Sequence, residues 1–195
     1  DLAELIQALG LGKPCLLGHS MGAATTAAAA AAYPDLVRCA ILEDPPWRQP
    51  SPETTAEGAA ARAAQWRDRT LGHKGMTREQ LIARVRLDNP TWPEAELDPW
   101  ADAKPRVSTH IFQGMALPRA PWQEVVQKIR CPILLITADP DKGAIVTPEI
   151  AQEAAGLWQE GEVAHITGAG HNIRREQYRA YVEVVRAFLG RVVGR

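Results

Sequence analysis

The chain has 195 residues, a net charge of −1 and 46% apolar residues, enough for one domain with a substantial core. The balanced charge argues against a nucleic-acid or anionic-membrane partner, and no apolar run reaches the about 18 residues of a membrane span. Three cysteines without metal-ligand spacing indicate free thiols in a reducing compartment, so we expect a cytoplasmic protein.

The first part of the chain alternates between helix and strand patterns. Apolar residues at helical spacing predict a helix over residues 1–9, and the apolar run 15–17 predicts a strand. An alanine-rich helix is expected over 22–32, ended by Pro34, because proline cannot continue a helix. The run 37–42 is apolar apart from Arg38, as is typical of a parallel strand that is buried on both faces.

Between the first strand and the alanine-rich helix lies the turn Gly18-His19-Ser20-Met21-Gly22. A Gly-x-Ser-x-Gly turn between a strand and a helix presents the serine as a nucleophile at the edge of a sheet. We expect that only small residues fit at Gly18 and Gly22, because a Cβ at either position would collide with neighbouring backbone. The backbone N–H of Met21 is expected to stabilise an oxyanion on the same side.

The composition changes from Trp47 to Pro121. Ten of the fifteen prolines lie between Pro45 and Pro121, and four of the six tryptophans lie in the same segment. Short helical patterns occur over 53–70 and from Thr77, where Gln80 completes a capping box. The aromatic content is too high for a disordered linker. The sequence therefore predicts a helical insertion over 47–121 between two core parts, 1–46 and 122–195.

Regular α/β order resumes after the insertion. A helix is expected over 122–129, a strand over 131–137 and a loop over 138–147 that contains Asp139 and Asp141. A helix then begins at Thr147-Pro148, and a strand is expected over 163–166. Gly170 and His171 follow this strand, and a last helix is expected over 174–189.

Ser20 requires a histidine base, and that base requires a carboxylate that fixes its tautomer. His171 is the candidate base, since it follows a strand and a glycine at the end of the sheet where such groups collect. The candidate acids are Asp139, which we place first, and then Asp141 and Asp44. The deciding criterion is geometric reach to His171. The other histidines lack partners at metal-ligand spacing, so no metal and no cofactor are expected.

The residues Gly18–Gly22, the acidic loop between Pro132 and Pro148, and Gly170-His171 closely resemble the α/β-hydrolase family. The resemblance implies the α/β-hydrolase fold, a mostly parallel sheet flanked by helices, with the insertion as a helical cap. It also implies the order serine, acid, histidine, which this chain follows. Relative to that fold the N-terminal strands have no counterpart, and neither has the loop that gives the second oxyanion donor. We therefore expect a second polypeptide or an N-terminal fragment to complete the sheet.

The resemblance implies a serine hydrolase that cleaves a carboxylic ester or lactone through an acyl-enzyme, and aromatic residues of the cap favour a small apolar or aromatic substrate. The same residues also serve carbon–carbon bond hydrolases, acyltransferases and perhydrolases. Because Ser20 stands where haloalkane dehalogenases and epoxide hydrolases need a carboxylate, those reactions are not expected. An alternative of another class is a non-catalytic binding module or receptor with a hydrolase-like fold.

Overall fold

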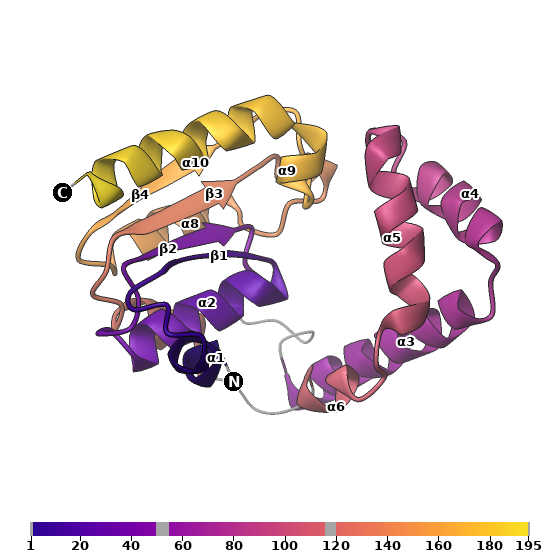
Figure 1. Cartoon of the computed structure of the whole chain (residues 1–195), viewed down its shortest axis with the longest axis horizontal. Helices are drawn as coiled ribbons and strands as arrows, with labels where there is room; N and C mark the ends of the chain where they lie inside the picture. The colour runs from indigo at the N-terminus through magenta and orange to yellow at the C-terminus, as the bar shows by residue number, and fades with distance from the viewer. Residues whose placement is uncertain (1, 50–54, 116–119, 195) are drawn as a thin grey trace. The chain divides into compact units, whose positions relative to one another are not determined.

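The computed structural model describes residues 2–49, 55–115 and 120–194, and the chain forms two compact units (Figure 1). The first unit joins Asp1–Arg48 to Ala120–Arg195, and the second is Gln49–Arg119. The second unit therefore begins and ends within the segment that the sequence analysis assigns to the insertion. Trp47 belongs to the first unit, where it is buried and stacks on Trp122 at 5.0 Å between ring centroids.

The first unit contains a sheet of four parallel strands in the order β1-β2-β3-β4. The strands are β1 (Cys15–His19), β2 (Cys39–Glu43), β3 (Ile133–Thr137) and β4 (Gly161–His165). The four strands thus form where the sequence predicts them, shifted by a few residues at their ends. The predicted parallel sheet flanked by helices is confirmed.

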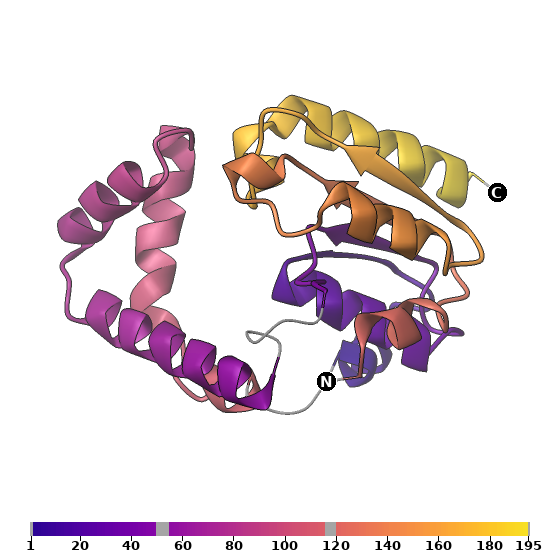
Figure 2. The same cartoon turned by 180° about the vertical axis from the view of Figure 1, so that it is seen from behind.

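Helices cover both faces of this sheet. They are α1 (Leu2–Ala8), α2 (Met21–Ala32), α7 (Trp122–Val126), α8 (Pro148–Ala155), α9 (Ile173–Glu176) and α10 (Tyr178–Val193), with a single turn η4 (Pro140–Lys142). Figures 1 and 2 show α10 on one face and α2 and α8 on the other. The two faces alternate along each central strand. In β2, Ala40 and Leu42 pack against α2 and α8, while Cys39 and Ile41 pack toward α10.

The register of the strands decides which loops meet. His19 at the end of β1 lies beside Glu43 at the end of β2, and Thr137 of β3 lies beside His165 of β4. The residues that follow all four strands therefore leave the sheet at the same edge, where active sites of parallel sheets form. This edge carries Ser20, Asp44, Asp139 and the loop that leads to His171.

Strand β1 pairs only with β2 among the residues that the structure describes, so one of its edges is open. Leu17 of this strand is 48% exposed, and Leu5, Leu9 and Leu11 nearby in the chain are exposed as well. An apolar open edge readily pairs with a further strand. That another polypeptide segment completes the sheet stays a prediction.

The described part of the second unit is helical. It contains α3 (Ala56–Lys74), α4 (Arg78–Asp88), η2 (Glu94–Glu96), α5 (Leu97–Ala103), η3 (Lys104–Arg106) and α6 (Ile111–Met115). The capping box expected at Thr77 and Gln80 is present at the start of α4. Val85, Trp92 and Leu97 form a small core between its helices. Part of the helix expected over 53–70 lies outside the described residues. A role as a cap remains a prediction.

Candidate active site

Ser20 is the single residue between the end of β1 and the start of α2, and its backbone has a positive φ of 54°. A non-glycine residue with this φ is strained, and such strain is typical of a nucleophile turn. The Ser20 N–H donates to the Glu43 carbonyl of β2 at 2.9 Å, which holds the turn against the neighbouring strand. Met21 is the first residue of α2, so its N–H has no acceptor within the helix.

The two glycines of this turn are not equivalent. A Cβ at Gly18 would overlap the backbone of Gly22 and Ala23, whereas a Cβ at Gly22 would have no atom within 4 Å. The requirement for a small residue is therefore confirmed at Gly18, and the prediction for Gly22 is wrong. The reason is that the start of α2 packs onto β1 at Gly18, while Gly22 itself faces open space.

His171 is paired with Asp44. Its Nδ1 lies 2.6 Å from Asp44 Oδ2, and the Asp44 carboxylate also accepts hydrogen bonds from the N–H groups of Ile145 and Val146 at 2.9–3.0 Å. Asp44 is fully buried, whereas the His171 side chain is 29% exposed. A carboxylate that accepts a hydrogen bond from Nδ1–H leaves Nε2 as the basic nitrogen of a neutral imidazole. This is the orientation that a general base requires.

Asp139, the first choice from the sequence, is not brought to His171. It binds the His165 Nε2 at 3.1 Å and the Gly168 N–H at 2.8 Å instead. The Gly168 N–H, with a smaller contribution from His165, lowers the pKa of Asp139. Asp141 is exposed and lies 3.9 Å from Lys142. By the criterion of geometric reach, the carboxylate at His171 is Asp44, one of the two alternatives to Asp139, and the first choice of Asp139 is wrong on this criterion.

The misassignment has a physical cause. Asp44 and Asp139 both follow apolar strands, so the sequence pattern does not separate them. Their contacts do. The N–H groups of Ile145 and Val146 hold the Asp44 carboxylate, which reaches His171 Nδ1. The Asp139 carboxylate is instead bound by the His165 side chain and the Gly168 N–H.

His19 connects the nucleophile turn to the base. Its Nε2 lies 2.7 Å from the His171 carbonyl oxygen, and the two imidazole rings are 4.5 Å apart. Since a carbonyl only accepts, Nε2 of His19 carries the proton and donates. Burial, and after it the charges of His171 and Arg174, lowers the pKa of His19 to about 4. His19 is therefore a neutral donor at neutral pH, a role that the sequence pattern alone does not reveal.

This depressed pKa predicts a pH-dependent stability. Because the folded state disfavours the imidazolium, His19 contributes stability above its unfolded pKa of 6.5, and this stability is lost as the pH falls toward 4. Over that range the free energy of unfolding of the wild type should fall by about 2 kcal/mol more than that of His19→Gln, after allowance for partial exposure. Urea unfolding at pH 7.0, 5.5 and 4.5 measures the difference. Parallel curves for the two proteins would contradict it.

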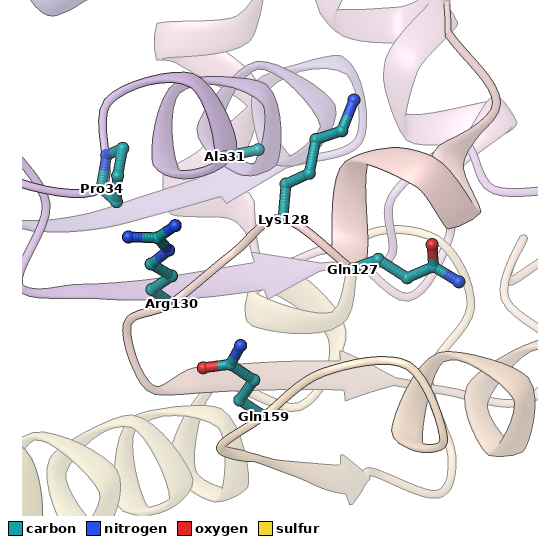
Figure 3. A pocket seen from close by; sticks show the side chains of 6 residues that line it. All are labelled: Ala31, Pro34, Gln127, Lys128, Arg130 and Gln159. Carbon is teal, nitrogen blue, oxygen red and sulfur yellow. The ribbon is translucent and has the colours of Figure 1, made fainter.

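A cavity of about 300 Å³ is lined by residues at the end of α2 and by residues that precede β3 and β4, which places it at the edge of the sheet opposite to Ser20 and His171 (Figure 3). Its polar lining consists of exposed side chains, among them Arg130 and Gln159. None of the candidate catalytic residues lines it.

The described residues show neither a metal-binding cluster nor a membrane-spanning helix. Within residues 2–49, 55–115 and 120–194, no group of three His, Cys, Asp or Glu side chains is arranged to hold a metal ion. In the same ranges no helix has the length and apolar character to span a membrane. Cys15, Cys39 and Cys131 are free thiols, of which the last two are buried.

Comparison with known proteins finds relatives among characterised enzymes. The N-formylmaleamate deformylase of Pseudomonas putida is 30% identical over 181 residues, which are 89% of this chain and 62% of the relative. The 2-(acetamidomethylene)succinate hydrolase of Mesorhizobium japonicum is 50% identical over 44 residues, 23% of this chain and 16% of the relative. The matches thus span less than two thirds of the length of these relatives.

Among solved structures, a thermophilic esterase from Thermogutta terrifontis with malate bound is similar, with a TM-score of 0.72 and 28% identity. The similarity covers 98% of this chain and 70% of the esterase. The model of the alpha/beta hydrolase family matches residues 1–184. Since this match includes nearly the whole chain, the family resemblance drawn from Gly18–Gly22 and Gly170-His171 is confirmed. The chain belongs to the alpha/beta hydrolase family, a family of hydrolases.

Proposed function

We propose that the protein is a serine hydrolase in which Ser20 is the nucleophile, His171 the general base and Asp44 the residue that orients the base. The observation that carries this proposal is the contact between the buried Asp44 carboxylate and His171 Nδ1 at the edge where the strained Ser20 turn lies. Neither the buried carboxylate nor the strained serine is needed for a surface turn. Their combination supports catalysis over a binding module.

The reaction would run in two stages. His171 Nε2 takes the proton from the Ser20 hydroxyl as its oxygen attacks a carbonyl carbon, and the Met21 N–H stabilises the oxyanion. His171 then gives this proton to the leaving group, and an acyl-Ser20 ester remains. Water, deprotonated by His171, attacks the ester, and the acid and the free Ser20 hydroxyl are released. In both stages the Asp44 carboxylate stabilises the imidazolium of His171.

For the substrate class, we propose the N-acyl C–N bond of a small carboxylate. The support comes from the relatives, since the names of the deformylase and the succinate hydrolase describe an N-formyl amide and an acetamido compound, each on a carboxylate skeleton. The same triad chemistry applies, with an amine as the leaving group that His171 must protonate. This proposal gives the carbon–nitrogen bond precedence over the ester or lactone bond expected from the sequence.

An ester substrate is the second candidate, supported by the esterase with 28% identity. Esters need less help from a general acid because an alkoxide leaves more readily than an amide nitrogen, so a triad that cleaves amides also cleaves activated esters. Carbon–carbon bond hydrolysis, acyl transfer and perhydrolysis would use the same three residues. They differ in what occupies the leaving-group and water positions, and no contact among the described residues favours one of them.

A comparison of substrates tests the proposal. We expect the wild type to release formate or acetate from N-formylmaleamate or 2-(acetamidomethylene)succinate with a higher kcat/KM than it hydrolyses p-nitrophenyl acetate or butyrate. Ser20→Ala should lower turnover of every substrate by about 10⁴-fold or more, since the acyl-enzyme cannot form. Turnover that survives in Ser20→Ala would remove Ser20 from its role. A wild type that cleaves only the esters would shift the substrate class to the second candidate.

A further inference from the structure

Glu43 is a buried carboxylate that the proposed reaction does not use. It is the last residue of β2, directly before Asp44, and none of its surface is exposed. Its carboxylate accepts two kinds of hydrogen bond from Arg174, one from the backbone N–H at 3.2 Å and others from Nη1 at 3.1–3.2 Å. A buried charge persists only where a partner and hydrogen bonds compensate its desolvation.

The groups around Glu43 shift the pKa of its carboxyl in opposite directions. Burial raises the pKa of Glu43, and the Arg174 guanidinium opposes this shift. Tyr181 of α10 lies on the same side, and burial together with the negative charge of Glu43 raises the pKa of Tyr181. Arg174 is thus the cation that faces Glu43, and its side chain is only 33% exposed.

Both members of the Glu43–Arg174 ion pair lie close in the chain to candidate catalytic residues. Arg174 is the second residue of α9 and follows His171 by three residues. Glu43 is adjacent to Asp44, which binds His171. The carbonyl of Glu43 also accepts the N–H of Ser20. The dipeptide Glu43-Asp44 therefore contacts the nucleophile turn, the imidazole of His171 and the start of α9.

The segment around His171 is held at three points. Asp44 binds the ring of His171, and His19 donates to the His171 carbonyl oxygen. The ion pair between Glu43 and Arg174 holds the chain three residues later, and we expect its loss to let the segment 171–174 shift against β2. Displacements of about 1 Å at reacting groups are enough to cost about 100-fold in rate.

We propose that Glu43 and Arg174 are positioning residues, whose ion pair fixes the segment that carries His171 to the strand that carries Asp44 and so sets the geometry of the His171–Asp44 pair. The proposal rests on the proposed function for its consequence in catalysis. Its geometric part concerns only the His171–Asp44 hydrogen bond, which is observable without a substrate.

The test uses two variants and one matched control. Glu43→Gln keeps the size of the side chain and one acceptor oxygen but removes its negative charge. Arg174→Gln removes the positive charge of the partner, whose side chain is partly exposed. Glu162→Gln is the control, because Glu162 in β4 also pairs with an arginine, Arg191, but does so on the surface. The readouts are the low-field proton NMR signal of the His171 Nδ1–H, identified by its loss in Asp44→Asn, and the rate at which a fluorophosphonate labels Ser20.

We expect Glu43→Gln and Arg174→Gln to broaden or shift the Nδ1 proton signal and to slow labelling by about 10- to 100-fold. The effects of the two changes should not multiply in the double variant, because each removes the same pair. Glu162→Gln should match the wild type in both readouts. Arg174→Gln decides the outcome if Glu43→Gln does not fold, since Arg174 is the less buried partner.

The inference is overturned if the folded variants keep the wild-type signal and label within about twofold of the wild-type rate, or if the wild type has no ordered Nδ1 proton to position. Failure of the proposed function has a different outcome. In that case Ser20 of the wild type is not labelled, while the Nδ1 signal still responds to Glu43→Gln and Arg174→Gln.

Discussion

Asp44→Asn is expected to lower kcat by about 10⁴-fold, while Asp139→Asn lowers it by no more than about 10-fold. Asparagine at position 44 can donate to Nδ1 or accept from it, and its amide cannot stabilise the imidazolium that forms as Ser20 loses its proton. Because Asp44 and His171 are in contact at 2.6 Å, the substitution acts on the imidazole itself. Asp139 acts only on the loop through His165 and Gly168, so its loss loosens the loop without changing the base.

The two aspartate variants form a matched pair, since each replaces a carboxylate at the end of a parallel strand by its amide. Steady-state kcat and KM for whichever substrate the wild type turns over best give the comparison. Thermal unfolding shows whether Asp44→Asn remains folded, because its side chain also accepts from the N–H groups of Ile145 and Val146. Equal losses in the two variants, or a larger loss in Asp139→Asn, would return the role of the acid to Asp139.

The second large effect is expected from the glycines of the nucleophile turn. Gly18→Ala should reduce the free energy of unfolding by about 3 kcal/mol and turnover by about 100-fold, because its methyl group would overlap backbone atoms of Gly22 and Ala23. The turn could accept the methyl only by moving α2, and with it Ser20 and the Met21 N–H. Denaturant unfolding and kcat together measure both consequences.

Gly22→Ala is the control for this change, with an expected effect of the opposite sign. Gly22 lies in the first turn of α2, and no atom lies within 4 Å of an added Cβ. Alanine is favoured over glycine in helices, so the substitution should stabilise the protein by up to about 0.5 kcal/mol and leave turnover nearly unchanged. A destabilising Gly22→Ala, or a harmless Gly18→Ala, would show that the turn is packed differently.

The architecture of the core could be predicted from the sequence because its signals are local. The apolar runs that became β2 and β3 are continuous, as expected of strands covered on both faces, and Pro34 marks the end of α2. The turn around Ser20 and the glycine before His171 are equally local. These features predict the fold, which is confirmed, and the candidate residues Ser20 and His171, whose catalytic roles stay predictions.

The remaining part of the site depends on contacts that sequence patterns do not carry. Which carboxylate reaches His171 follows from side-chain contacts, since Asp139 binds His165 and the Gly168 N–H while Asp44 binds His171. The role of His19 required the contact with the His171 carbonyl, and that of Glu43 required its pairing with Arg174. Trp47 gave no local sign that it belongs to the core, since its stacking partner Trp122 is distant in sequence.

The central claim is that Ser20 is a nucleophile activated by His171 and Asp44. Reaction with a fluorophosphonate, followed by intact mass and peptide mapping, measures this most directly because it needs no knowledge of the substrate. We expect one adduct per chain, located on Ser20, with labelling slowed by orders of magnitude in Asp44→Asn and retained in Asp139→Asn. Absence of an adduct on Ser20 in the folded wild type would contradict it, as would labelling that does not depend on Asp44.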